Sequence, residues 1–118
     1  MAIRRVVPHL RTDDFAAARA FYAGLLGFDV AMDLGWIVTF ASPDNPTAQV
    51  NVYGEQAPPA SLQPVMSIEV DDVDAVHADA GRRGVDIALP LTDEPWGVRR
   101  FFVQDPSGHV VNVLSHRR

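Results

Sequence analysis

The fold of this chain is decided by the stretch Glu94-Pro-Trp-Gly-Val-Arg-Arg-Phe-Phe-Val-Gln-Asp-Pro-Ser-Gly-His-Val-Val-Asn-Val-Leu114. Within it, Val98–Val103 and Val110–Leu114 are rich in β-branched, aromatic and aliphatic residues, which favour strands. Between them, Asp105-Pro106-Ser107-Gly108 has proline at the second position and glycine at the fourth, as is typical of a type I turn. The stretch therefore predicts a β-hairpin with a fixed register.

Asn112 is the polar exception in the second strand of this hairpin. Side chains alternate between the two faces of a strand, so Val111 and Val113 share one face. Asn112 then lies on the other face with Val110 and Leu114. A buried amide has to be hydrogen-bonded, so Asn112 is a position at which ligand chemistry is expected.

The composition limits the class of protein. The chain has 118 residues, 47% hydrophobic and 21% charged, which is typical of one globular domain. It has no cysteine, which excludes disulfides and thiolate chemistry. Ten basic and 15 acidic residues give a net charge of −5, which argues against nucleic acid or an anionic membrane as partner. The sequence has neither an apolar membrane span nor a signal-peptide core, so we expect a soluble, cytoplasmic protein.

The chain also contains an internal repeat. The first copy predicts a strand, a helix capped by Asp13-Asp14 and ended by Gly27, and three further strands: Arg4–Thr12, then Phe28–Met32, Trp36–Ala41 and Gln49–Tyr53. The apolar face expected for the helix consists of Phe15, Ala18, Tyr22 and Leu25. After a proline-rich linker the same order returns, with a helix capped by Asp71-Asp72 and strands at Val65–Val70, near Val85–Leu89, at Val98–Val103 and at Val110–Leu114.

The spacing of matched residues supports a duplication. Val7 and Val65 are 58 residues apart, as are Asp14 and Asp72, and Asn51 precedes Asn112 by 61. We therefore predict a single α+β domain of tandem βαβββ modules. The first module covers about 1–54, the linker about 55–64 and the second module about 65–118. The modules are expected to form a mixed, curved sheet around a cleft, with the helices on its convex face.

Five motifs carry a family resemblance. They are Val7-Pro-His-Leu-Arg-Thr-Asp-Asp14, Phe21-Tyr22 followed by Leu25-Leu26-Gly27-Phe28, Val70-Asp-Asp-Val-Asp-Ala75, Glu94-Pro95-Trp96-Gly97, and Asp105-Pro106-Ser107-Gly108. Together they resemble the vicinal oxygen chelate superfamily, which contains glyoxalase I, extradiol dioxygenases, and fosfomycin and bleomycin resistance proteins. The Pro-Trp-Gly motif is most similar to the bleomycin resistance branch. The resemblance implies paired βαβββ modules that form a cleft.

The resemblance also implies where a metal would be held. Enzymes of the superfamily bind a divalent metal with His and Glu side chains, and the corresponding positions here are Val7, Val65, Asn51 and Asn112. Valine has no ligand atom, and a neutral amide is a poor ligand for Zn, Fe or Mn. We therefore expect no metal and no cofactor.

The candidate ligand-binding residues are those predicted to line the cleft: His9, Trp36, Phe40, Asn51, Tyr53, Glu69, Trp96, Phe102 and Asn112. Each has a structural alternative. The aromatic residues fit a core as well as a stacking surface, and the two asparagines could bond each other, water or backbone. Glu69 could pair with Arg11, and His9 could be a hydrogen-bonded wall residue. The other histidines, His77, His109 and His116, are expected to face solvent.

Three functions remain open on the sequence. The first is a metal-independent protein that sequesters an antibiotic or aromatic metabolite, without catalytic residues. The second is a lyase, isomerase or dioxygenase with relocated metal ligands such as His9 and Glu69, and the third is a dimeric accessory module with an inert cleft. For the first, we expect a planar aromatic ligand, cationic or neutral, in a groove bordered by Trp36 and Trp96. We also expect a homodimer.

Overall fold

A computed structural model of the chain describes residues 2–58 and 62–117. The chain divides into two compact units. We call Val7–Gln63 the N-terminal unit, and the residues up to Val6 together with those from Pro64 onward the C-terminal unit. The middle of the predicted linker, residues 59–61, lies outside the described residues.

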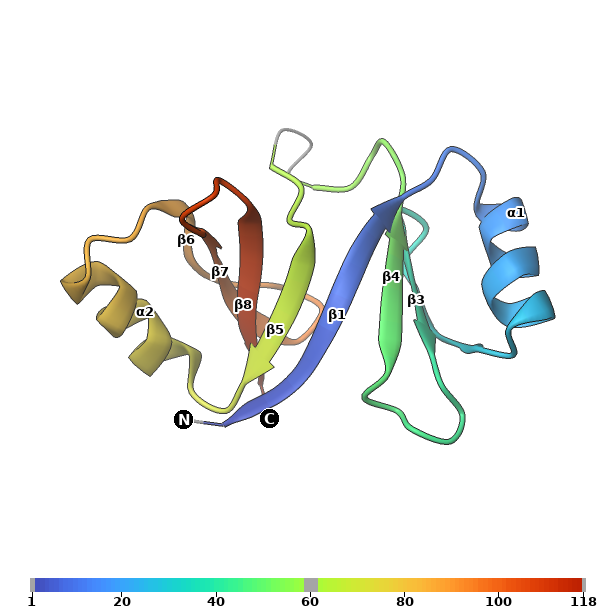
Figure 1. Cartoon of the computed structure of the whole chain (residues 1–118), viewed down its shortest axis with the longest axis horizontal. Coiled ribbons are helices and arrows are strands. Elements are labelled where there is room, and N and C mark those ends of the chain that lie inside the picture. Colours follow the sequence, from blue (N-terminus) through green and yellow to red (C-terminus); the bar gives the residue numbers. More distant parts are fainter. Residues whose placement is uncertain (1, 59–61, 118) are drawn as a thin grey trace. The chain divides into compact units, whose positions relative to one another are not determined.

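The N-terminal unit is a four-stranded sheet with one helical segment. Its elements are β1 (Ile3–Arg11, whose first residues belong to the C-terminal unit), α1 (Phe15–Arg19), the π-helix η1 (Ala20–Leu25), β2 (Asp29–Asp33), β3 (Ile37–Ala41) and β4 (Gln49–Tyr53). The strand order is β2-β3-β4-β1, and only the β4–β1 pair is parallel. The helical segment packs on one face (Figure 1), where Phe15, Ala18 and Tyr22 contact Val38, Phe40 and Val52.

The C-terminal unit repeats this arrangement. It contains β5 (Met66–Val70), α2 (Val73–Arg82), β6 (Ile87–Asp93), β7 (Val98–Gln104) and β8 (Val110–His116) in the strand order β5-β8-β7-β6. The β5–β8 pair is parallel, as β1–β4 is in the first copy. Under α2 lies a core that includes Val70, Val73, Phe101, Val111 and Val113. The predicted α+β fold of tandem βαβββ modules is confirmed.

The predicted hairpin is confirmed in its register and in its turn. Val98 to Gln104 pair antiparallel with His116 to Val110, and Gly108 N–H donates to the Asp105 carbonyl at 3.0 Å. The Asp105 carboxylate accepts from the backbone N–H groups of Ser107 and His109, each at 2.9 Å. Gly108 has φ of 90°, a value that favours glycine. As predicted, Val111 and Val113 face the α2 core, so Asn112 faces the opposite side.

Both helices begin where the sequence indicates, but the first does not keep its predicted face. Asp14 and Asp72 cap the two helices through their carboxylates, which accept from Ala17 and Ala75 backbone N–H groups. After Arg19 the backbone widens into the π-helix η1, which changes the rotation per residue. The predicted core residue Leu25 is therefore 71% exposed, which corrects the periodicity argument.

β6 extends further than the sequence indicates. We expected a strand near Val85–Leu89, ending before Pro90, but β6 continues to Asp93. Its register with β7 shifts between Leu89 and Thr92, which accommodates a residue that has no backbone N–H. β6 is also an edge strand in the strand order, where proline is tolerated. In the described residues, no helix is long and apolar enough to cross a membrane.

Candidate functional site

A polar row crosses the N-terminal unit on the face opposite α1. Asn51 in β4 is paired in register with His9 of β1 on one side and Thr39 of β3 on the other. The Thr39 hydroxyl donates to the Asn51 amide oxygen, and the Asn51 amide nitrogen lies 3.1 Å from His9 Nε2. Because that nitrogen is a donor, His9 Nε2 accepts and its proton is assigned to Nδ1. Both amide atoms of Asn51 are therefore bonded within the protein.

The C-terminal unit carries the repeat of this row. Asn112 in β8 is paired in register with Ser67 of β5 and Phe102 of β7. Its amide nitrogen donates to Ser67 Oγ at 2.8 Å. Phe102 stands where the first row has Thr39, and a phenyl ring has no hydroxyl to donate. Consequently the buried Asn112 amide oxygen has no hydrogen-bond partner among the described residues.

Next to this row, Arg100 is a buried cation that we did not single out from the sequence. It is 7% exposed, and its Nε and Nη2 both contact Glu94 Oε2, at 2.7 and 2.6 Å. The guanidinium also lies over the Trp96 and Phe102 rings, 5.1 and 4.8 Å from their centroids. Burial lowers the pKa of Arg100, and the nearby Glu94 carboxylate opposes that shift. The sequence did contain a signal for Arg100, because strand alternation places this charged residue on the same face as the apolar residues Val98 and Phe102.

Glu69 has different partners from those we expected. Its carboxylate is 15% exposed and contacts Arg5 Nε at 2.9 Å and His116 Nδ1 at 2.8 Å. Arg11, the predicted partner, instead contacts Asp13 and Glu55, each at 3.2 Å. Glu69 is therefore bonded to residues of its own C-terminal unit. Arg11 belongs to the N-terminal unit, and the expected Arg11–Glu69 pair stays a prediction.

The three histidines expected to face solvent make defined contacts. His77 packs edge-on against Phe101 with ring centroids 5.0 Å apart, so it faces the core rather than solvent. His109 and His116 are exposed, but their Nδ1 atoms lie 2.9 Å from Asp105 and 2.8 Å from Glu69. His109 and His116 therefore each have one ring nitrogen engaged by a carboxylate.

Phe40 and Phe102 are both fully buried, but in different places. Phe40, which we expected at a ligand site, lies instead in the core under α1, where its ring centroid is 5.3 Å from that of Tyr22. The strand alternation explains the correction, because Phe40 lies on the face opposite Thr39. Phe102 shares its face with Asn112, and Arg100 stacks on it.

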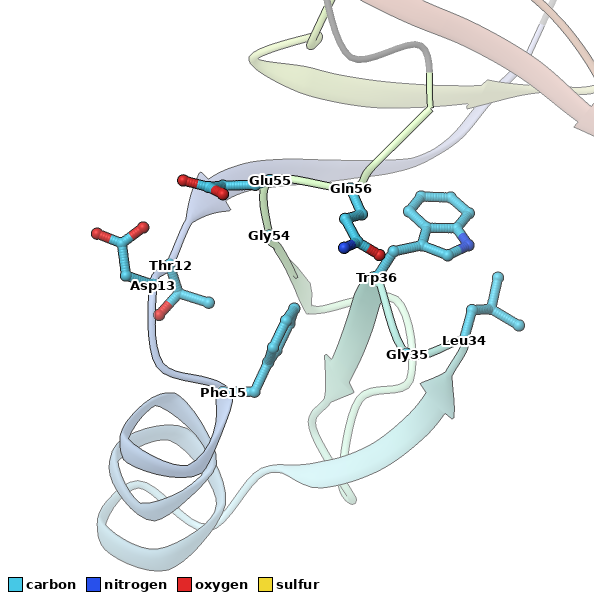
Figure 2. Close-up of a pocket in the computed structure, with 9 residues that line it drawn as sticks. All are labelled: Thr12, Asp13, Phe15, Leu34, Gly35, Trp36, Gly54, Glu55 and Gln56. Carbon is cyan, nitrogen blue, oxygen red and sulfur yellow. The ribbon is translucent and has the colours of Figure 1, made fainter.

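A pocket of about 790 Å³ in the N-terminal unit is bordered by Trp36. Trp36 directly precedes β3. Tyr53 is the last residue of β4 and is paired in register with Ile37, the residue after Trp36. Figure 2 shows Trp36 and Leu34 at one end, the Phe15 ring in the middle, and the carboxylates of Asp13 and Glu55 at the other end. The remaining lining residues are Thr12, Gly35, Gly54 and Gln56.

The close approach of Phe15 to the backbone shapes this pocket. A Cβ added at Gly54 would lie 3.0 and 3.2 Å from two Phe15 ring atoms, so only glycine fits without displacing the ring. Gly54 N–H donates to the Trp36 carbonyl at 3.0 Å, which ties the Trp36 backbone to the end of β4. Trp36 and Trp96 belong to different units, and the predicted groove bordered by both stays a prediction.

The residues at the inherited metal positions do not fit a metal. Val7 is buried and Val65 is exposed, and neither has a donor atom. The Asn51 amide oxygen already accepts from Thr39, and Asn112 offers a single neutral oxygen. Within the part of the chain that the structure describes, no group of three or more His, Asp or Glu residues is arranged to hold a metal ion.

Comparison with known proteins identifies the family. The chain belongs to the Glyoxalase/Bleomycin resistance protein/Dioxygenase superfamily, whose sequence model matches residues 2–113. None of the curated proteins is similar enough in sequence to match the chain.

Solved structures with the same fold are distant in sequence. A superfamily member from Vibrio splendidus 12B01 is 20% identical, with a TM-score of 0.66 over 98% of this chain and 99% of that one. Methylmalonyl-CoA epimerase from Mycobacterium tuberculosis is 17% identical, with a TM-score of 0.72 over 98% and 88%. The Mn(II)-bound glyoxalase from Novosphingobium aromaticivorans is 23% identical, with a TM-score of 0.65 over 98% and 40%. At these identities the likeness shows the fold alone.

Proposed function

We propose that the protein is a metal-independent small-molecule binding protein of the glyoxalase/bleomycin resistance type, which sequesters an antibiotic or aromatic metabolite stoichiometrically. The donor set at the inherited metal positions carries this proposal. Two valines and two amides replace the imidazoles and carboxylates that hold divalent metals in enzymes of the fold. Both amides are bonded to neighbouring side chains, which suits hydrogen bonding better than coordination.

The pocket bordered by Trp36 supports an aromatic ligand. An indole face contributes roughly 0.5–1.5 kcal/mol of stacking beyond the burial of area. At the opposite end, Asp13 and Glu55 share one guanidinium nitrogen of Arg11, so two carboxylates are balanced by a single cation. That excess negative charge, like the chain's net charge of −5, favours a cationic or neutral ligand over an anion.

The assignment to the bleomycin resistance branch rests on the Pro-Trp-Gly motif, which forms the turn before β7. Glu94 N–H donates to the Val98 carbonyl, and Gly97, with φ of 94°, donates to the Glu94 carbonyl. This turn places Trp96 against Arg100. The Pro-Trp-Gly motif that suggested this branch thus has a structural role within the C-terminal unit, and it also places Trp96 beside the polar row.

Metal content tests the first part of the proposal. The purified protein is expected to contain no stoichiometric Zn, Fe, Mn or Ni after dialysis, because none of the four inherited positions offers a strong ligand. Elemental analysis by plasma mass spectrometry measures this directly. A near-stoichiometric metal would refute the proposal and support an enzyme with relocated ligands.

A titration tests the ligand class. Metal-free bleomycin and the planar cation 9-aminoacridine are titrated by calorimetry against the parent, Trp36→Phe and Trp36→Ala. We expect Trp36→Ala to weaken binding at least tenfold, about 1.4 kcal/mol, and Trp36→Phe to retain most of the affinity. The anion 9-acridinecarboxylate is the matched control. Tighter binding of that anion would refute the charge argument, and equal binding by Trp36→Ala would show that Trp36 does not contact the ligand.

A further inference from the structure

The repeated polar rows differ in one hydrogen bond, and the difference leaves an unfilled acceptor. In the first row Asn51 is bonded on both sides, by Thr39 and His9. In the second row Asn112 is bonded only by Ser67, and its amide oxygen is buried without a donor among the described residues. Such a group is costly in a folded protein, since a buried unsatisfied acceptor destabilises the fold unless something binds it.

Within the part of the chain that the structure describes, Arg100 has hydrogen-bond donors without an acceptor on the same face of the sheet as Asn112. Arg100 is opposite Leu114 and Asn112 is opposite Phe102, so Arg100 and Asn112 are diagonal neighbours on β7 and β8. Glu94 is the hydrogen-bond acceptor of the Arg100 guanidinium among the described residues, through Nε and Nη2 to one oxygen. The guanidinium has five N–H donors, so those on Nη1 remain for another acceptor.

From this arrangement we propose that the C-terminal unit holds a ligand site, between Asn112 and Arg100, for a small neutral group that both donates and accepts a hydrogen bond. A carboxamide is the simplest such group. Its N–H donates to the Asn112 oxygen, and its carbonyl accepts from Arg100. The Cα atoms of diagonal neighbours in a sheet are about 7–8 Å apart, a separation at which long side chains on the same face can contact one small molecule.

The charges already present select a neutral ligand. Arg100 is balanced by Glu94, whose carboxylate is 16% exposed, so the buried pair has no net charge. A carboxylate ligand would add an uncompensated negative charge, and a cation would face the guanidinium. Either is expensive to bury. The Asn112 oxygen is enclosed, so the group that reaches it has to be small.

This site does not involve Trp36, so it is tested separately from the aromatic pocket. Acetamide, acetate and acetamidinium have nearly the same shape and carry charges of 0, −1 and +1, while N,N-dimethylacetamide is neutral but lacks a donor. Each is titrated into ¹⁵N-labelled protein, following the side-chain signals of Asn112 Nδ2 and Arg100 Nε. The Asn51 side-chain signal is the internal control, because its row is already bonded.

Acetamide is expected to shift the Asn112 and Arg100 signals saturably while leaving Asn51 in place. The other three compounds are expected to bind at least tenfold more weakly. Asn112→Leu should abolish the acetamide-dependent shift at Arg100. Arg99→Gln, which removes the adjacent arginine of the same strand, should retain the response, because Arg99 contacts Asp74 and Asp93 on the other face.

Three outcomes would overturn the site. They are shifts that rise linearly with all four compounds, saturable binding of acetate or acetamidinium as tight as that of acetamide, and an acetamide response at Arg100 that survives in Asn112→Leu. A cross-peak from Asn112 to a long-lived water, unaffected by acetamide, would show that the oxygen is satisfied by solvent only and would equally refute the proposal.

Discussion

Replacing each of the two asparagines by leucine is expected to change the stability of the protein in opposite directions. Asn51→Leu removes two side-chain hydrogen bonds, each worth about 1 kcal/mol, and leaves the buried Thr39 hydroxyl without its acceptor, which costs about 1–3 kcal/mol more. We therefore expect the free energy of unfolding to fall by about 3–5 kcal/mol. Asn112→Leu removes one bond, to Ser67, of similar strength, but it also removes an unbonded buried oxygen that costs about 1–3 kcal/mol. The net change is expected between neutral and about 2 kcal/mol of added stability.

Urea unfolding of the parent and both variants measures the contrast. Leucine has the same number and branching of side-chain heavy atoms as asparagine but a larger volume, so an overpacking cost enters both variants, and the pair serve as controls for each other. The free energies of unfolding of the two variants should differ by at least about 3 kcal/mol, with m-values equal to that of the parent. If Asn112→Leu loses as much stability as Asn51→Leu, the Asn112 oxygen has a partner in solution and the asymmetry between the rows is wrong.

Two further predictions concern assembly and pH. The protein is expected to be a homodimer, because β2 and β6 are edge strands and because Phe21 and Leu25 of η1 and its C-cap residue Leu26 are exposed. Light scattering that gives a monomer mass at micromolar concentration would contradict this. Asp105 accepts hydrogen bonds from His109, first from its backbone N–H and then from its side chain, and these lower the pKa of the Asp105 carboxyl from its ordinary value of 3.8. The stability that this carboxylate contributes is therefore present above pH 3.8 and is lost as the pH falls through the lowered pKa of the folded state. The urea midpoints of the parent and Asp105→Asn should therefore differ at pH 7 and converge well below pH 4, and a difference that persists there would show that the charge of Asp105 is not responsible.

Periodicity and turn chemistry predicted most of the fold from local signals. Asp14 and Asp72 cap their helices, the turn at Asp105–Gly108 fixes the β7–β8 register, and the predicted bounds of β4 agree with the structure residue for residue. These features depend on residues close in sequence, where hydrogen-bonding groups have few alternatives. The side on which Asn112 lies followed from the same alternation.

The errors concern the exposure of Leu25, the face of β3 on which Phe40 lies and the end of β6. Leu25 was assigned to the core from a regular α-helical spacing, but η1 is a π-helix and no residue in it signals the change. Phe40 was chosen for its ring, although alternation places it opposite Thr39 and under α1. A strand was expected near Val85–Leu89, whereas β6 runs past Pro90 to Asp93 because its register with β7 shifts there.

The partners of charged residues were the least predictable part of the candidate site. Glu69 and Arg11 were matched by their positions in the repeat, but an ion pair forms with whichever opposite charge its long side chain can reach. Arg5 reaches Glu69 from the adjacent part of β1, within the same unit. Arg100 was missed because its role depends on Glu94 and Trp96, which a turn brings beside it. Sequence spacing alone does not contain that geometry.

The duplication gives two equivalent polar rows, and they differ in hydrogen bonding because Phe102 stands where the first row has Thr39. Equivalent positions of the two modules hold Asn51 and Asn112, flanked by His9 and Ser67 on one side and by Thr39 and Phe102 on the other. In the row that contains Thr39, both amide atoms of Asn51 are hydrogen-bonded within the protein. In the row that contains Phe102, the ring supports the stacked Arg100 but leaves an acceptor unfilled. If Asn112 holds the proposed ligand, the two modules provide one such site per chain, and the acetamide titration should saturate at one equivalent. A second equivalent that binds at Asn51 would mean that the Thr39 hydrogen bond opens readily.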